Sequence, residues 1–175
     1  MLESFRKPAL LLAAFAVNPN AYAGDGGTIT FNSSVFASTC APEAGSVNFL
    51  VLLADAQDQA LVGVGRTTNR TPFKIDLSHC AAGNVHAYFD YGSYTDSNTG
   101  HIKTSLPKQD LQLLNADSTP IRLGAVDIAQ YSKAVAVASD GTATLEYFVE
   151  YIAAEDGSVT AGDLIAQLTY SIAYD

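Results

Sequence analysis

The last thirteen residues of the chain, 163–175, alternate strictly between two kinds of side chain, and this pattern constrains the fold more than any other feature. The odd positions are mostly polar or small, and the even positions are apolar or aromatic: Leu164, Ala166, Leu168, Tyr170, Ile172 and Tyr174. Because side chains alternate between the two faces of a strand, the pattern predicts a terminal strand with one apolar face. That face must be covered, either by the strand's own domain or by another chain.

Similar short segments recur along the preceding hundred or so residues. They are residues 71–78, 85–91, 111–115, 121–123 and 145–153, which are apolar at alternate positions or throughout. Links rich in Asp, Asn, Ser and Gly, such as 96–100 and 115–118, separate them, and these residue types favour turns. No segment of ten or more residues has helical periodicity. The chain is therefore predicted to be all-β, an antiparallel sandwich.

A second alternating segment lies near the other end of the chain, after the glycine-rich residues 24–27. One parity holds Ile29, Phe31, Ser33, Val35 and Ala37. The other parity holds Thr28, Thr30, Asn32, Ser34, Phe36 and Ser38. Because glycine gives this extension a flexible start, it is a poor candidate for a core strand that is fixed from its first residue, and it is free to reach elsewhere.

Residues 1–23 have the pattern of a secretory signal peptide. Arg6 and Lys7 precede an apolar run over residues 9–17, and Ala21-Tyr22-Ala23 offers small residues where a signal peptidase cleaves. The alternative is a membrane anchor, but a spanning helix needs about 20 apolar residues. We therefore expect cleavage after Ala23 and export of the remaining chain.

Export changes the interpretation of the chain's two cysteines, Cys40 and Cys80. An isolated, even pair in an exported protein favours one structural disulfide. The alternative is a Cys/His metal site that uses His79, His86 or His101, but these histidines form no short paired motif with the cysteines. We therefore expect a disulfide and no metal.

Composition excludes several functions. The formal net charge is −9, which disfavours binding to the phosphate backbone of nucleic acids. The chain has no G-x-S-x-G or H-E-x-x-H motif, and Gly63-Val64-Gly65 is too short to bind phosphate as a loop. We therefore expect no catalytic residues, no cofactor and no nucleic-acid partner.

Taken in order, these segments resemble the subunits of bacterial pili built by the chaperone–usher pathway, in the type 1 fimbrial family. The resemblance extends over essentially the whole chain after the signal peptide, including the spacing of the two cysteines. The segments that carry it are Thr-Pro-Phe-Lys-Ile-Asp-Leu-Ser-His-Cys at 71–80, Asn-Val-His-Ala-Tyr-Phe at 84–89, Leu-Gln-Leu-Leu-Asn-Ala-Asp at 111–117, Phe-Val-Glu-Tyr-Ile-Ala at 148–153, and Thr-Ala-Gly at 160–162 before the alternating end.

The resemblance implies an incomplete immunoglobulin-like β-sandwich, residues 39–175, that lacks its last strand. A neighbouring subunit would supply that strand from its extension, residues 24–38, with Ile29, Phe31, Ser33, Val35 and Ala37 as donor side chains. Residues Leu164 to Tyr174 would form one wall of the acceptor groove. The implied partners are neighbouring pilin subunits in a head-to-tail polymer, a periplasmic chaperone and an outer-membrane usher, and the implied location is a cell-surface fimbrium that supports adhesion.

One position departs from the family pattern, and one alternative function stays open. The family commonly has glycine in the donor segment where this chain has Ser33, whose hydroxymethyl group needs extra space. The alternative is a carbohydrate-binding tip or minor adhesive subunit of the same pilus, with a sugar patch formed by Tyr88, Tyr91 and Tyr94 around Asp90 and Asp96.

Overall fold

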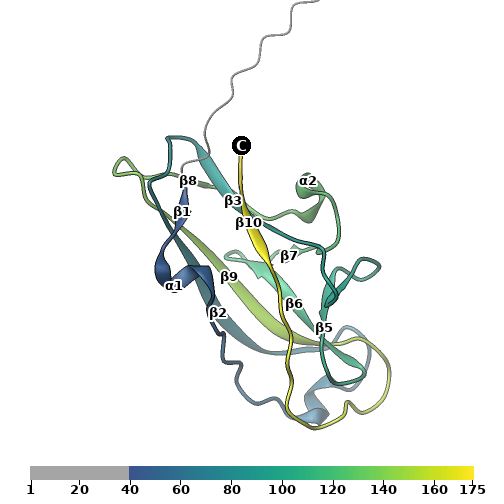
Figure 1. Cartoon of the computed structure of the whole chain (residues 1–175). Helices are drawn as coiled ribbons and strands as arrows, with labels where there is room; N and C mark the ends of the chain where they lie inside the picture. Colours follow the sequence, from purple (N-terminus) through teal and green to yellow (C-terminus); the bar gives the residue numbers. More distant parts are fainter. Residues whose placement is uncertain (1–39) are drawn as a thin grey trace, which may run out of the picture. The chain divides into compact units, whose positions relative to one another are not determined.

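The computed structural model describes residues 40–175, and these residues form two β-sheets that enclose an apolar core (Figure 1). The larger sheet has seven strands in the order β1-β2-β9-β6-β5-β4, with β7 paired to β6. Its strands are β1 (Ala41–Pro42), β2 (Thr67–Ser78), β4 (Thr95–Asp96), β5 (His101–Lys103), β6 (Gln109–Asn115), β7 (Pro120–Ile121) and β9 (Ala143–Ala153).

The smaller sheet has three strands in the order β10-β3-β8. They are β3 (Asn84–Phe89), β8 (Val135–Ala136) and β10 (Tyr170–Tyr174). The helical elements are short: α1 (Ala44–Val47), η1 (Asp58–Leu61) and α2 (Asp127–Gln130). All the strand pairs in both sheets are antiparallel.

Alternating apolar residues place the long strands β2, β9 and β6 at the centre of the larger sheet. Directly opposite residues of an antiparallel pair share a face, and the register pairs Phe73 with Tyr147 and Ile75 with Leu145. The same face of β9 continues with Val149, which lies opposite Leu113 of β6. One face of the larger sheet is therefore continuously apolar.

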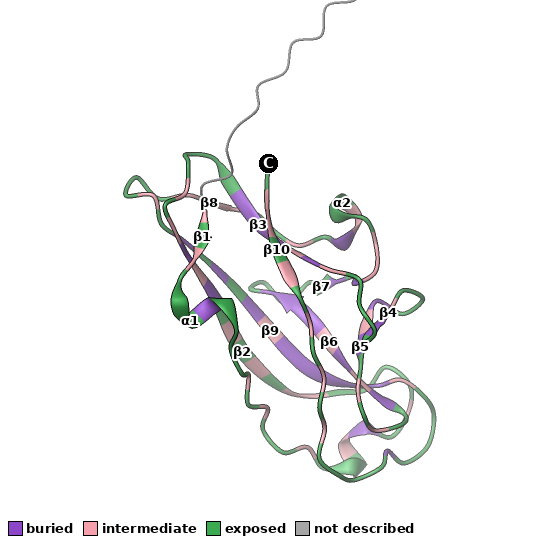
Figure 2. Cartoon of the chain, in the orientation of Figure 1, coloured by how far each residue is buried: buried purple, intermediate pink, exposed green. Residues whose placement is uncertain are grey.

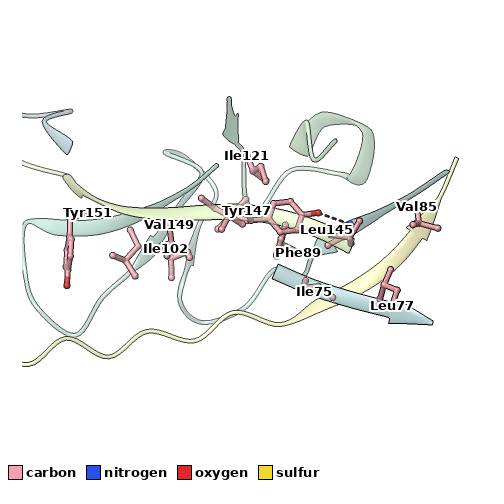
Figure 3. Close-up of a cluster of buried hydrophobic side chains, with 14 of the residues drawn as sticks. Ile75, Leu77, Val85, Phe89, Ile102, Ile121, Leu145, Tyr147, Val149 and Tyr151 are labelled. Atoms are coloured by element: carbon pink, nitrogen blue, oxygen red, sulfur yellow. Dashed lines mark hydrogen bonds between the residues drawn. The ribbon is translucent and has the colours of Figure 1, made fainter. Parts of the chain in front are cut away.

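The core lies between that face and the smaller sheet, as Figures 2 and 3 show. Phe89 of β3 packs edge-on against Tyr147 of β9, with ring centroids 5.3 Å apart. The buried Tyr147 hydroxyl accepts a hydrogen bond from the backbone N–H of Ala87 at 3.2 Å. This residue thus joins the two sheets by both apolar packing and a hydrogen bond.

A disulfide between Cys40 and Cys80 closes the start of the described chain onto the end of β2. Next to it, β1 pairs with the last residues of β2, with Ala41 opposite Ser78. The disulfide expected from the isolated cysteine pair is confirmed, and it removes both thiols as ligands for the alternative metal site. Residues 40–175 contain no cluster of three or more metal-ligating side chains.

The all-β prediction is confirmed, but several predicted strand bounds need correction. β2, β6 and β9 begin before the predicted residues, and the segment predicted as strand 121–123 is a strand only up to Ile121. The segment predicted as strand 85–91 stops pairing at Phe89. The segment predicted as strand 163–175 pairs with a neighbour only over Tyr170–Tyr174. Alternation of apolar and polar residues indicates which face of a strand each side chain occupies. Strand pairing also needs an adjacent strand, and no strand of the described chain lies beside 163–169.

Candidate functional site

The last strand, β10, has a neighbour on one side only. It pairs with β3 from Tyr170 opposite Phe89 to Tyr174 opposite Val85, and it forms the end of the smaller sheet. Figure 1 shows β10 in yellow at this position. The other side of β10, which we call the open edge, is the candidate functional site.

Hydrogen bonds at the two ends of the ladder show which backbone groups face the open edge. The N–H of Asp90 donates to the carbonyl of Thr169 at 2.9 Å, and the N–H of Asp175 donates to the carbonyl of Asn84 at 3.1 Å. Bonded and non-bonded residues alternate in an antiparallel ladder, so the odd residues of β10 bond to β3. The N–H and C=O groups of the even residues therefore point outwards, and within residues 40–175 they have no hydrogen-bond partner.

The side chains of the same even positions are only half covered. Leu164, Ala166, Leu168, Tyr170 and Ile172 are all of intermediate exposure and pack against the core cluster. Core apolar residues elsewhere are almost fully buried, with Ile75 and Val85 at 0% exposure. The sixth even residue, Tyr174, is exposed at 37% and lies outside that cluster. The open edge thus combines free backbone groups with partly exposed apolar side chains.

A second stretch of chain with half-covered apolar residues follows α1. In this segment, residues 48–57, Val51, Leu53 and Ala56 pack against the core cluster but are not fully buried. Phe73 of β2 has the same intermediate burial, and its ring lies 6.1 Å from the ring of Phe49. The core is therefore incompletely covered on this side as well.

Two tyrosines of β10 connect the open edge to the chain around α1. The Tyr174 hydroxyl accepts a hydrogen bond from the backbone N–H of Cys40 at 2.8 Å. The Tyr170 hydroxyl donates to the carbonyl of Ser46 in α1, and partial burial raises the pKa of Tyr170. Ser46 is itself fixed to β2, because its Oγ accepts from the N–H of Asp76 at 2.9 Å. Residues 40–46 thus stand opposite β10.

The expected donor side chains Ile29, Phe31, Ser33, Val35 and Ala37 lie outside the described residues, as does the expected signal peptide. Of the expected acceptor residues, Tyr170, Ile172 and Tyr174 lie on β10, and Leu164, Ala166 and Leu168 lie in the stretch of chain that leads into it. Sequence reasoning did not single out residues 48–57. It also did not predict that Tyr170 and Tyr174 both bond to the chain around α1. The apolar run Phe49-Leu50-Val51-Leu52-Leu53 was the available signal for the former.

Comparison with known proteins identifies the family. The family model of the type-1 fimbrial protein, A, matches residues 53–175. The chain belongs to the type-1 fimbrial protein family. It is 37% identical over 174 residues to the major fimbrial subunit SMF-1 of Stenotrophomonas maltophilia, covering 94% of this chain and 100% of that protein. It is 36% identical over 159 residues to the F17 fimbrial protein of Escherichia coli, covering 85% and 87% of the two chains.

Solved structures show the same fold for this fimbrial subunit. The P pilus rod subunit PapA superposes with a TM-score of 0.63 at 15% identity, covering 79% of this chain and 100% of that one. A chaperone–usher pilus structure superposes with a TM-score of 0.61 at 17% identity, covering 87% and 97%. The predicted incomplete immunoglobulin-like sandwich is confirmed, and the protein is a structural subunit of a fimbrium.

Two residues of the alternative sugar patch, Asp96 and Tyr88, are engaged in structural contacts in this fimbrial subunit, whereas Tyr91 and Tyr94 are exposed. Asp96 accepts from the N–H of Asn98 at 2.9 Å, and this hydrogen bond, helped by Lys103, lowers the pKa of Asp96. Tyr88 lies within β3, opposite Ser171 of β10. The comparisons favour no adhesive function over the structural one. No helix within residues 40–175 is long and apolar enough to span a membrane.

Proposed function

We propose that this fimbrial subunit polymerises by donor-strand exchange, in which residues 24–38 of one subunit pair with the open edge of the next. The observation that carries the proposal is the row of unpaired backbone groups at Tyr170, Ile172 and Tyr174 beside half-covered apolar side chains. An added strand satisfies such groups through ladder hydrogen bonds, while its alternate side chains enter the core and determine register. Because each subunit offers both an extension and an edge, the contact does not close and a filament results.

The extension has side chains suited to that edge. Its inward parity would place Ile29, Phe31 and Val35 against the incompletely covered core. Burying an apolar side chain contributes about 1.5–3 kcal/mol, so the three together contribute on the order of 5–9 kcal/mol before ordering costs. The ladder hydrogen bonds add to this gross gain, which opposes the entropic cost of association.

The same edge explains why helper proteins are needed before assembly. An unpaired strand with apolar side chains promotes aggregation. We therefore infer that a periplasmic chaperone lends a strand to the exported subunit until an outer-membrane usher places it in the growing fimbrium. Tyr170→Asp should weaken that rescue, because it places a carboxylate among apolar side chains. The readout is the amount of soluble periplasmic subunit with and without the chaperone.

The direct test removes the extension. A chain that lacks residues 24–38 should retain its fold and its Cys40–Cys80 bond, because both sheets, the core cluster and the disulfide described above are formed within residues 40–175. It should form no fimbriae, and a synthetic peptide of residues 24–39 should bind to it. Phe31→Asp in the full chain should act like the deletion, since an unpaired carboxylate in an apolar site costs several kcal/mol. Normal fimbriae from the deleted chain would contradict donor-strand exchange.

Ser33→Gly tests the shape of the acceptor at one position. If the acceptor keeps the small site that the family commonly has for glycine, assembly should be unchanged or faster, because a hydroxymethyl group is removed from a crowded place. A marked loss of fimbriae would show that the site is shaped around serine. Electron microscopy of isolated fimbriae gives the measurement.

A further inference from the structure

Three large apolar side chains beside the open edge point outwards, away from the core. Leu50 and Leu52 are 81% and 78% exposed, and Ile165 is 64% exposed. Each alternates with residues that pack inwards, Val51 and Leu53 on one side and Leu164 and Ala166 on the other. These three residues, which we call the outer rim, are not part of the acceptor face described above.

The two tyrosine contacts place the two sides of the rim opposite each other. Tyr174 meets residue 40 and Tyr170 meets Ser46, so the two stretches of chain run in opposite directions. Ile165 lies five residues before Tyr170, and Leu52 lies six after Ser46. An extended chain advances about 3.3 Å per residue, so Ile165 and Leu52 lie at closely similar distances along the edge. In Figure 1 both stretches descend from the α1–β10 region towards η1.

We propose that Phe36 of the incoming extension packs on the outer rim, between Leu52 and Ile165, and that this contact acts together with the inward side chains to select the register of the donor strand. The proposal rests on donor-strand exchange. A strand lying beside 163–175 must point one parity outwards, and Phe36 is the one large apolar residue on that parity of the extension. Its companions there are Thr28, Thr30, Asn32, Ser34 and Ser38.

The register that follows accounts for the whole extension. In an antiparallel arrangement, placing Phe36 opposite Ile165 puts Val35 opposite Ala166, Phe31 opposite Tyr170 and Ile29 opposite Ile172. Directly opposite residues share a face, so each inward donor residue meets an inward residue of the edge. In a parallel arrangement the same Phe36 contact would place Ile29 before residue 163, beyond the alternating segment. The inner contacts thus allow antiparallel registers that differ by two residues, and the outer contact selects the one that places Phe36 opposite Ile165 rather than opposite Asp163 or Gln167.

The outer rim is also chemically suited to this occupant. The protein is acidic, with a formal net charge of −9, so two copies repel each other at long range. Leu50, Leu52 and Ile165 are uncharged, and contact with a phenyl ring removes their apolar surface from water. A second copy of this chain therefore fits the rim without bringing like charges together at that point.

The test compares fimbriae assembled from full-length chain variants. Phe36→Thr keeps a side chain suited to a strand but removes the ring, and we expect its fimbriae to dissociate in guanidinium about tenfold faster than wild type. Leu52→Ser should speed dissociation to a similar extent, because it removes the rim side chain that Phe36 contacts. The double variant should dissociate no faster than the stronger single variant, because both changes remove the same contact. Ile128→Ser is the matched control, since Ile128 is 89% exposed on α2, away from the open edge.

Each result either supports or overturns the outer contact. Wild-type dissociation of the Phe36→Thr fimbriae, or effects of Phe36→Thr and Leu52→Ser that simply add, would overturn it. Loss of all fimbriae with Phe36→Thr combined with wild-type behaviour of Leu52→Ser would also overturn it, because the rim would then have no part. Failure of donor-strand exchange itself gives a different result, since the chain that lacks residues 24–38 would then still assemble.

Discussion

The two edges of the smaller sheet differ in how their backbone groups are satisfied. On the side of β3 away from β10, every outward-facing residue has a partner within the subunit: Val85 pairs with Val135 of β8, the N–H of Ala87 bonds to Tyr147, and Phe89 bonds to Gln130. On the free side of β10, the even residues have no partner within residues 40–175. The subunit is thus complete at one edge and open at the other, which supports the proposal that assembly uses β10.

Gln130 shows how thoroughly the closed edge is completed. Its side chain is fully buried, accepts from the N–H of Phe89 at 3.1 Å and donates to the carbonyl of the same residue at 2.7 Å. The amide therefore replaces a paired strand residue at the position where β8 no longer reaches. Buried backbone groups are costly to leave unpaired, which explains a buried glutamine there.

The largest effect on stability is expected from Gln130→Leu. The substitution keeps the apolar volume but leaves the N–H and C=O of Phe89 unpaired in the interior, so the free energy of unfolding should fall by about 2–5 kcal/mol. The matched change at the open edge is Gln167→Leu, at an exposed side chain, and it should alter stability by less than about 0.5 kcal/mol. Urea unfolding of the two variants measures both values. Equal losses would remove the distinction between the edges.

A smaller effect is expected from removing one hydroxyl at each edge. Tyr147 and Tyr174 each accept a hydrogen bond from a backbone N–H, of Ala87 and of Cys40. Tyr147→Phe leaves its partner unpaired in the core and should cost about 1–2 kcal/mol, whereas at the exposed Tyr174 water replaces the hydroxyl and the cost should be below about 1 kcal/mol. Thermal unfolding measures the stability lost in each variant. A larger loss of stability for Tyr174→Phe than for Tyr147→Phe would contradict the assignment of the closed and open edges.

The smallest effect concerns an ion pair on the closed side. A hydrogen bond from Lys133, helped by Thr119, lowers the pKa of Asp117 to about 2 from the ordinary value of 3.8. A lowered folded-state pKa stabilises the protein above the unfolded-state value, and this contribution is lost as the pH falls from about 4 to 2. Asp117→Asn should therefore weaken the dependence of stability on pH in this range only. An unchanged slope in acid titrations followed by circular dichroism would show that the pair contributes nothing.

The open edge was easier to predict from sequence than the closed one. Alternation at 164–174 reports side-chain faces directly, so the apolar face of the last strand emerged from the pattern, and the resemblance to fimbrial subunits implied that this face borders an acceptor groove. The closed edge depends on Gln130 and Tyr147, which come from distant segments and meet β3 only after the sheets pack. The two-residue strands β1, β4 and β8 were likewise not predicted, because two residues carry no periodicity, and β7 was predicted only through the overlapping segment 121–123. Local sequence patterns therefore predicted the apolar faces of strands, whereas contacts between distant segments determine at which sheet edge the backbone groups have hydrogen-bond partners.

Amide hydrogen exchange along β10 tests the central claim most directly. The subunit lacking residues 24–38 is measured alone and after addition of the peptide of residues 24–39. The amides of Ser171, Ala173 and Asp175 bond to β3, so they should be protected in both states, whereas those of Tyr170, Ile172 and Tyr174 should exchange rapidly alone and become protected with the peptide. Even-numbered amides that are already protected without the peptide, or that stay unprotected with it, would contradict strand addition at this edge.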